Sequence, residues 1–183
     1  MPTVGTKQIK DRPAGDFYET PAWCTELLVN SMDVPIFSKI IEPCAGHGAI
    51  SKVLNKALNS PYIIQNELVR NDKLTGNYGF FDYLKLENFD LEVDYVITNP
   101  PFSLAREFIE KSLFVYQNAI IIMLLPLDYM GSKGRNPFWT KNPPSEIKVL
   151  SKRPSFTGKG TAASNYGWFH WRTDPVHPIS FLI

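Results

Sequence analysis

The sequence lacks the features that mark secreted, metal-binding or membrane proteins. Its 183 residues include only two cysteines, Cys24 and Cys44, whose spacing matches neither a disulfide framework nor a zinc site. It has no apolar run of about eighteen residues and no basic segment followed by an apolar one at the N-terminus, so we expect neither a membrane span nor a signal peptide. These absences favour a cytoplasmic protein.

The sequence also has little net charge, +1 at neutral pH, so composition alone gives no sign of nucleic-acid binding. The charges are unevenly distributed, however. Residues 131–160 contain seven basic residues and one acidic residue, whereas residues 81–110 contain seven acidic residues and two basic ones. The basic segment is either an ordinary solvated surface or a face that contacts phosphates. Within it, the candidates for phosphate contact are Lys133, Arg135 and Lys141.

The apolar pattern predicts one domain of the α/β class. With 44% hydrophobic residues the chain can form one sizeable core. Residues 1–16 lack apolar periodicity and predict a flexible arm, which leaves a single domain over 17–183. Short apolar runs predict strands at 39–42, 62–65, 79–81, 95–98 and 119–125. They alternate with helical patterns at 20–32, 47–58 and 103–116, which predicts a mostly parallel sheet with helices on both faces. Residues 147–150 and 166–171 predict an antiparallel hairpin at the C-terminal end.

The first predicted helix has a defined start signal. Thr20 is the expected N-cap, and Pro21 is the expected first helical residue, where a missing backbone N–H costs least. Apolar residues at helical spacing continue from there to Met32. We therefore expect a helix to follow Thr20.

The loop after the first predicted strand, residues 42–48 (EPCAGHG), contains the glycines of a ligand-binding turn. In an open parallel sheet, ligands bind beyond the carboxyl ends of the strands, where glycines such as Gly46 and Gly48 let backbone N–H groups approach them. The alternative is a tight strand-to-helix turn without a ligand. The loop lacks the G-x-G-x-x-G pattern of nicotinamide sites and the G-K-[ST] ending of a P-loop, which disfavours hydride transfer and nucleotide hydrolysis.

Carboxylates follow the next two predicted strands. Glu67 stands where a carboxylate can accept hydrogen bonds from both hydroxyls of a ribose. Asp82 follows the third strand, where it can accept from an adenine amino group while Phe81 and Tyr83 flank the ring. This arrangement suits S-adenosylmethionine better than a dinucleotide.

A second loop, residues 99–102 (NPPF), follows the fourth predicted strand. The side-chain oxygen of Asn99 and the carbonyl of Pro100 can each accept one hydrogen of a planar amino group. Pro101 stiffens the turn, and Phe102 offers a face on which a planar base can stack. The alternative is a strand-terminating turn with a core phenylalanine. Together, the two loops predict a pocket for a methyl donor beside a pocket for an amine.

Taken in order, these motifs resemble those of the DNA adenine-N6 methyltransferases. The resemblance is carried by D-x-Y-x-T-P at 16–21, E-P-x-A-G-x-G at 42–48, Asp82 and N-P-P-F at 99–102. It extends to RPSFTG at 153–158 and YGWFHW at 166–171, so it covers nearly all of the chain after the arm. The sequence is similar to short phage or prophage members of that group.

The resemblance implies a Rossmann-like class I methyltransferase fold with S-adenosyl-L-methionine as cofactor, S-adenosyl-L-homocysteine as product and no metal. It implies DNA as the partner, with the target adenine flipped out of a duplex, in the cytoplasm of a bacterial or phage-infected cell. The implied catalytic residues are Asn99, Pro100, Pro101 and Phe102. The implied cofactor-binding residues are Tyr18, Thr20, Pro21, Glu42, Cys44, Ala45, Gly46, Gly48, Glu67, Phe81 and Asp82.

Some of these roles have alternatives. Glu42 either orients the glycine loop, approaches the cofactor or acts as a capping carboxylate. Tyr166 is a candidate for base stacking, although alternating aromatics in a strand more often form core packing.

The sequence is also compatible with two other hypotheses about the function of the whole chain. The same pocket suits an RNA adenine-N6 or a protein-glutamine N5 methyltransferase, and the fold also suits a DNA-binding module without turnover. The Thr20-Pro21 segment and the basic C-terminal third favour DNA. Only about eighty residues follow the second loop, too few for a large target-recognition domain, so we expect short or relaxed sequence specificity.

Overall fold

The computed structural model describes residues 19–59, 61–70, 72–87, 91–158, 160–174 and 179–182. The expected arm at 1–16 and Tyr18 lie outside these ranges. The helices and strands are α1 (Ala22–Asn30), β1 (Lys39–Glu42), α2 (Ala49–Ala57), β2 (Tyr62–Asn66), β3 (Asn77–Gly79), β4 (Tyr95–Thr98), α3 (Ala105–Val115), β5 (Ile120–Pro126), α4 (Asn136–Lys141), β6 (Glu146–Leu150), β7 (Tyr166–Trp171) and β8 (Ile179–Leu182). Short 3-10 turns cover 83–85, 102–104 and 127–129.

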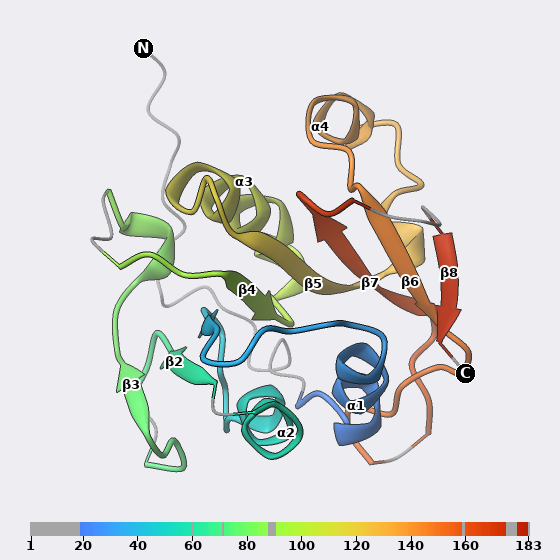
Figure 1. Ribbon diagram of the computed structural model, residues 1–183. Coiled ribbons are helices and arrows are strands. Elements are labelled where there is room, and N and C mark those ends of the chain that lie inside the picture. Colours follow the sequence, from blue (N-terminus) through green and yellow to red (C-terminus); the bar gives the residue numbers. More distant parts are fainter. Residues whose placement is uncertain are drawn as a thin grey trace.

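The strands form one sheet in the order β3-β2-β1-β4-β5-β7-β6-β8 (Figure 1). The pairs from β3 to β5 are all parallel. β7 is antiparallel to both β5 and β6, while β8 pairs with β6 in parallel. This confirms the predicted α/β sheet with an antiparallel hairpin at its end. The strand order reverses between β1 and β4, which is the position where open parallel sheets bind ligands.

Helices cover both faces of the sheet, with α1 and α2 on one side and α3 on the other (Figure 1). Alternate residues of β5 belong to two different core clusters: Ile121 and Met123 pack in one, and Ile122 and Leu124 in the other. All four side chains are fully buried. A strand buried on both faces explains why this segment is a continuous apolar run.

Two side chains from the C-terminal strands hold α1 against the sheet. The indole N–H of Trp168 donates to the Cys24 carbonyl at 2.9 Å. The ammonium of Lys148 donates to the carbonyl of Ser31, the residue that follows α1, at 2.8 Å. A cation at this end of a helix is favoured by the negative end of the helix dipole.

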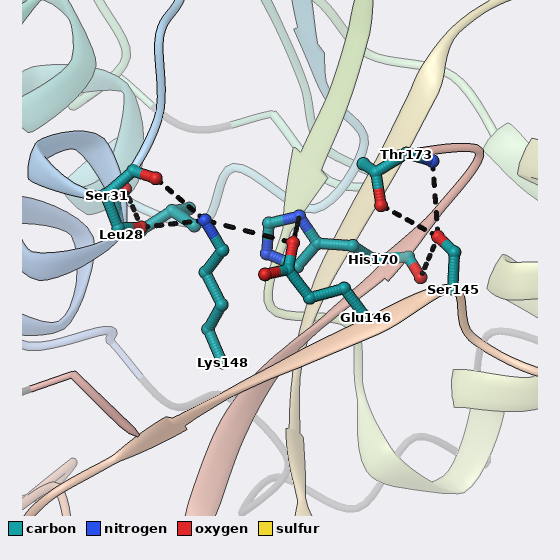
Figure 2. Close-up of polar contacts among 7 residues, drawn as sticks. All are labelled: Leu28, Ser31, Ser145, Glu146, Lys148, His170 and Thr173. Carbon is teal, nitrogen blue, oxygen red and sulfur yellow. Dashed lines mark hydrogen bonds and ion pairs between the residues drawn. The ribbon is translucent and has the colours of Figure 1, made fainter. Parts of the chain in front are cut away.

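Lys148 belongs to a buried polar cluster with Glu146 and His170 (Figure 2). The Glu146 carboxylate lies 3.9 Å from both the Lys148 ammonium and Nδ1 of His170. Burial, together with the charge of Lys148, lowers the pKa of His170 to about 3. The imidazole is therefore neutral at physiological pH, and the cluster contains one cation and one anion.

The start of α1 differs from the prediction. The N-cap is Pro21 rather than Thr20, and no side chain caps the helix. The Thr20 hydroxyl instead accepts a hydrogen bond from the side-chain amide of Asn99. The helix ends at Asn30, two residues before the predicted end at Met32, because Ser31 has left the helical conformation.

Other elements also differ from the prediction. β3 lies two residues earlier than predicted, because this short edge strand is largely exposed and shows no burial pattern. α2 begins at Ala49 rather than at residue 47, since Gly48 is its N-cap with a left-handed backbone. The helix α4 and the edge strand β8 have no counterpart in the prediction.

Candidate active site

The two predicted loops start side by side. β1 pairs with β4 in parallel, with Ile40 opposite Tyr95 and Ile41 opposite Val96. The glycine loop after Glu42 and the N-P-P-F loop after Thr98 therefore leave the same edge of the sheet on neighbouring strands. This edge is the switch point of the strand order, so the fold itself brings the two sequence motifs together.

The conformation of the glycine loop requires glycine. Gly46 and Gly48 have φ angles of 55° and 74°, in the left-handed region that disfavours other residues. A Cβ atom on Gly48 would lie 2.7 Å from Oε1 of Gln65. A side chain at position 48 would therefore have to displace the end of the Gln65 side chain, in addition to adopting the left-handed backbone.

Glu67 is positioned by the backbone around it. Its Oε2 accepts from the N–H of Gly46 at 2.9 Å, and its Oε1 accepts from the N–H of Leu68 at 2.9 Å. The residue is 8% exposed. Because each carboxylate oxygen can accept more than one hydrogen bond, both remain suited to the hydroxyls of a ribose.

Asn66 joins the loops that follow β1, β2 and β3. Its side-chain nitrogen donates to the carbonyls of Pro43, at 3.3 Å, and Phe81, at 3.0 Å, while its side-chain oxygen accepts from the N–H of Phe81 at 3.1 Å. Its own carbonyl accepts from the N–H of Ala45 at 2.8 Å. Asn66 was not among the predicted site residues. The sequence feature that could have indicated its role is a polar side chain at the end of an apolar strand.

Asp82 follows the segment that Asn66 holds. One of its oxygens accepts from the N–H of Leu84 at 3.2 Å, and the other lies 3.3 Å from the ammonium of Lys85. The side chain remains 28% exposed. Tyr83 does not flank this position as expected. It is buried in the core, where its hydroxyl lies 2.9 Å from that of Ser112.

Glu42 is fully buried beneath the start of α2. Its carboxylate accepts from the backbone N–H of Ser51 at 3.1 Å and contacts the Ser51 hydroxyl. Burial raises its pKa to about 8, opposed by the hydrogen bonds from Ser51 and reinforced by the nearby charge of Glu67. Among the three roles considered from the sequence, this geometry is that of a capping carboxylate. Cys44, two residues later, is half-buried against the core.

The side chain of Asn99 has a fixed orientation in the second loop. Its nitrogen donates to the Thr20 hydroxyl at 3.0 Å, so its oxygen is the atom that can accept from a substrate amine. Pro100 and Pro101 are both buried, and Thr20 is only 5% exposed. The loop is therefore rigid before any substrate binds.

A row of aromatic rings continues from this loop. The ring centroids of Phe102 and Tyr166 are 5.8 Å apart, and those of Tyr166 and Phe156 are 5.0 Å apart. Tyr166 is 4% exposed, so most of its surface takes part in packing. Phe156 was not among the predicted site residues, although its motif carried part of the resemblance.

The structure does not gather the three basic candidates at this edge. The Arg135 guanidinium lies 4.1 Å from the centroid of the Tyr129 ring and donates to the Tyr129 carbonyl at 2.8 Å. Lys141 ends α4, and the carbonyl of the next residue, Asn142, accepts from the indole of Trp171 at 3.1 Å. Trp171 is the last residue of the antiparallel strand β7, so Lys141 is at the opposite edge of the sheet. Lys133 is exposed in the loop that precedes α4.

Comparisons with known proteins give matches in structure only. No model of a known protein family matches the chain, and no curated protein matches it in sequence. A structure from Listeria monocytogenes, provisionally described as a class I S-adenosylmethionine-dependent methyltransferase, superposes with a TM-score of 0.64 at 15% identity, covering 94% of this chain and 68% of that one. The chain has the class I methyltransferase fold.

Other structures with this fold differ in their described substrates. A protein from Pyrococcus horikoshii, provisionally described as an RNA methyltransferase, gives a TM-score of 0.62 at 16% identity over 87% of this chain and 89% of that one. An S-adenosylmethionine-dependent O-methyltransferase from Thermotoga maritima gives 0.55 at 17% identity over 82% and 65%. The class I methyltransferase fold accommodates both, so the substrate must be argued from the site residues.

Within the described part of this class I methyltransferase fold, no helix is long and apolar enough to cross a membrane. Nor does any group of three or more histidine, cysteine, aspartate or glutamate side chains come together there in a way that would hold a metal ion.

Proposed function

We propose that this chain transfers a methyl group from S-adenosylmethionine to the exocyclic N6 of adenine in DNA, with short or relaxed sequence specificity. The observation that carries the proposal is the hydrogen bond that fixes the Asn99 amide to Thr20, directly beside the glycine loop. It presents an acceptor oxygen to an amine at the place where the fold binds its ligands.

The residues of the first loop fit the proposed cofactor. The left-handed backbone of Gly46 and Gly48 forms the tight turn at which backbone N–H groups can approach a cofactor. The Glu67 carboxylate suits the ribose hydroxyls, and the partly exposed Asp82 suits the adenine amino group. When bound, S-adenosylmethionine supplies a methyl group already activated by a sulfonium.

The second loop compensates for the weak nucleophilicity of the amine, whose lone pair is delocalised into the adenine ring. The Asn99 side-chain oxygen and the Pro100 carbonyl each accept one of its two hydrogens. Holding both hydrogens directs the lone pair away from the ring and stabilises the positive charge that develops on the nitrogen. Because two prolines stiffen the loop, these acceptors need no reorganisation during the reaction.

Phe102 gives the adenine a ring to stack on, and the buried Tyr166 packs against Phe102. Phe102 adjoins the amine acceptors, and Tyr166 and Phe156 extend the row from there. A base inside a duplex cannot reach this loop, so a duplex substrate has to expose its adenine by base flipping.

RNA is the second candidate substrate. It is favoured by the likeness to the Pyrococcus horikoshii structure, which covers nearly the whole of both chains. The acceptors at Asn99 and Pro100 also suit the amide of a protein glutamine. The retained Asn99, Glu67 and Asp82 argue against a DNA-binding module without turnover.

The test incubates the purified protein and S-adenosylmethionine separately with duplex DNA, single-stranded DNA, RNA and a protein extract, followed by mass spectrometry of the digested products. We expect N6-methyladenine in DNA. Asn99→Ala should reduce its formation by about 10²- to 10³-fold while S-adenosylhomocysteine still binds in calorimetry. The matched control is Asn55→Ala, at an exposed position of α2, which should keep full activity.

The other outcomes each contradict a defined part of the proposal. Methylation only in RNA or only in protein would replace the substrate. Cofactor binding without methylation of any substrate would favour the binding module. If the protein had no affinity for S-adenosylhomocysteine, the proposal that it transfers methyl groups would be wrong.

A further inference from the structure

The loop between β6 and β7, residues 151–165, lies at the same edge of the sheet as the candidate active site. β6 and β5 are both antiparallel to β7, so they run in the same direction. Leu150 therefore ends β6 at the edge where β5 ends, and Tyr166 starts β7 opposite Pro126 at that edge. Any cation at the base of this loop is close to the proposed substrate.

Two exposed cationic side chains, Lys152 and Arg153, lie at the base of the loop. The ammonium of Lys152 lies 4.6 Å from the centroid of the Trp23 ring, in the first turn of α1. The guanidinium of Arg153 donates to the carbonyl of Ala163 on the returning side of the loop, at 3.3 Å. Next to it, the N–H of Ala162 donates to the carbonyl of Pro154 at 2.7 Å. These contacts fix the direction of both cations.

The charge around these cations is positive. Residues 147–173 contain five lysines and arginines and no aspartate or glutamate. Among the described residues, the ion pairs of Lys and Arg with carboxylates involve other cations: Arg70, Lys85, Arg106 and Lys148. Asp128, an acidic side chain that contacts the loop, accepts a hydrogen bond from Ser164. No ion pair with a described carboxylate therefore competes with the binding of an external anion by Lys152 and Arg153.

The same loop also carries a ring of the aromatic row. Phe156 follows Arg153 by three residues and stacks edge-on against Tyr166. A cation pair and an aromatic ring thus lie on one short segment beside Phe102. A nucleotide has this combination of groups, a planar base with an anionic phosphate on each side of its sugar.

We propose that Lys152 and Arg153 bind the phosphates of the DNA backbone next to the target adenine. This inference rests on the proposed function, since it takes DNA as the substrate. It places the phosphate contacts on the β6–β7 loop, whereas Arg135 packs on the Tyr129 ring and Lys141 lies at the opposite edge of the sheet. Such contacts position the nucleic acid without reading its sequence, in agreement with the expected relaxed specificity.

The test measures the affinity for a short labelled duplex that contains adenines at several salt concentrations, with S-adenosylhomocysteine present. In Lys152→Gln/Arg153→Gln, the slope of log affinity against log salt should become shallower by about 1.8, because each lost phosphate contact contributes about 0.9. Lys52→Gln/Lys56→Gln removes the same charge from exposed positions of α2 and should keep the wild-type slope. Lys152→Arg/Arg153→Lys should also keep it.

The outcomes separate this inference from the proposed function. If Lys152→Gln/Arg153→Gln keeps the wild-type slope, or if the α2 control loses as much, the phosphate surface is wrong, and adenine methylation by the wild type would still stand. If the wild type makes no N6-methyladenine but the slope changes as expected, the surface stands and the proposed activity is wrong. Unchanged S-adenosylhomocysteine binding in each variant shows that the fold is intact.

Discussion

The side-chain nitrogen of Asn99 donates a hydrogen bond to the hydroxyl of Thr20 across 3.0 Å, joining two residues that are 79 positions apart in the chain. Thr20 lies just before α1, and Asn99 directly follows β4. The orientation of the amide that we assign to the substrate amine therefore depends on where α1 lies against the sheet. The two elements have to be correctly placed together for the acceptor oxygen to face the substrate.

Replacing Thr20 with valine should lower methyl transfer without weakening cofactor binding. The substitution removes the acceptor for the Asn99 nitrogen, and a hydrogen bond of this kind contributes about 1 kcal/mol, so we expect a loss of roughly 5- to 10-fold in kcat. Thr20→Ser retains the hydroxyl and should recover most of the rate. Equal activity in Thr20→Val and the wild type would contradict the positioning role.

Replacing Glu67 with glutamine should weaken cofactor binding. The amide nitrogen would face one of the two N–H donors, Gly46 or Leu68, and one charged acceptor would be lost. Hydrogen bonds to charged groups contribute about 1.5–3 kcal/mol, so S-adenosylhomocysteine affinity should fall roughly 10- to 100-fold. Calorimetry on Glu92→Gln, a change at an exposed position, provides the control. A similar loss there would show that the effect is not local.

Glu42 should make the stability of the protein depend on pH. Its pKa is about 8 in the folded chain against an ordinary value of 4.5. Between these two values the folded state holds a proton that the unfolded state releases, so this contribution to stability is complete below pH 4.5 and is lost as the pH rises through 8. Glu42→Gln stays neutral and keeps an acceptor for Ser51. In denaturant unfolding, the free energy of unfolding of the variant relative to that of the wild type should increase by up to a few kcal/mol as the pH rises. Parallel pH profiles would contradict this.

Gly48→Ala should both destabilise the protein and impair cofactor binding. The new Cβ would lie 2.7 Å from Gln65 Oε1 at a φ of 74°, and backbone strain of this kind costs about 1–3 kcal/mol. The matched control is Gly131→Ala, whose Cβ would make an ordinary contact at 3.6 Å with the Asp128 carbonyl. Thermal unfolding and calorimetry should show a loss in the first variant alone.

Lys148→Met should destabilise the protein and leave the Glu146 carboxylate, which is only 13% exposed, without its cation (Figure 2). Breaking such a pair costs about 3–5 kcal/mol, and the double variant Lys148→Met/Glu146→Gln should recover part of that loss. The pKa of His170 should also rise, because the charge of Lys148 helps to lower it. NMR titration of the His170 ring tests this second effect. An unchanged titration would contradict the electrostatic coupling.

The strands with the strongest burial were predictable from the sequence. β1, β4 and β7 have the predicted bounds because their residues are almost all buried, which leaves a continuous apolar or aromatic signal between turn residues. α4 was missed because it has only six residues and includes a proline. β8 was missed because it has only four residues at the exposed edge of the sheet.

In the site, the sequence indicated which loops meet but not how their side chains are held. The glycine and N-P-P-F loops are adjacent because β1 and β4 are adjacent. The alternation of strands and helices predicted a mostly parallel sheet, but it did not predict the strand order. The hydrogen bonds of Asn66 to Pro43 and Phe81 could not be foreseen, because backbone acceptors leave no mark in the sequence. The same holds for Thr20, whose partner Asn99 replaced the expected cap.

The anchoring of α1 by Trp168 and Lys148 sets an order for the biosynthesis of the site. The Trp168 indole contacts a residue made 144 positions earlier, and Lys148 contacts one made 117 positions earlier. A chain growing on the ribosome thus exposes both loops long before it contains the strands that hold α1 in place. The Asn99 amide that we assign to the substrate amine should therefore reach its final orientation only after β7 has emerged, so shorter nascent chains should be inactive.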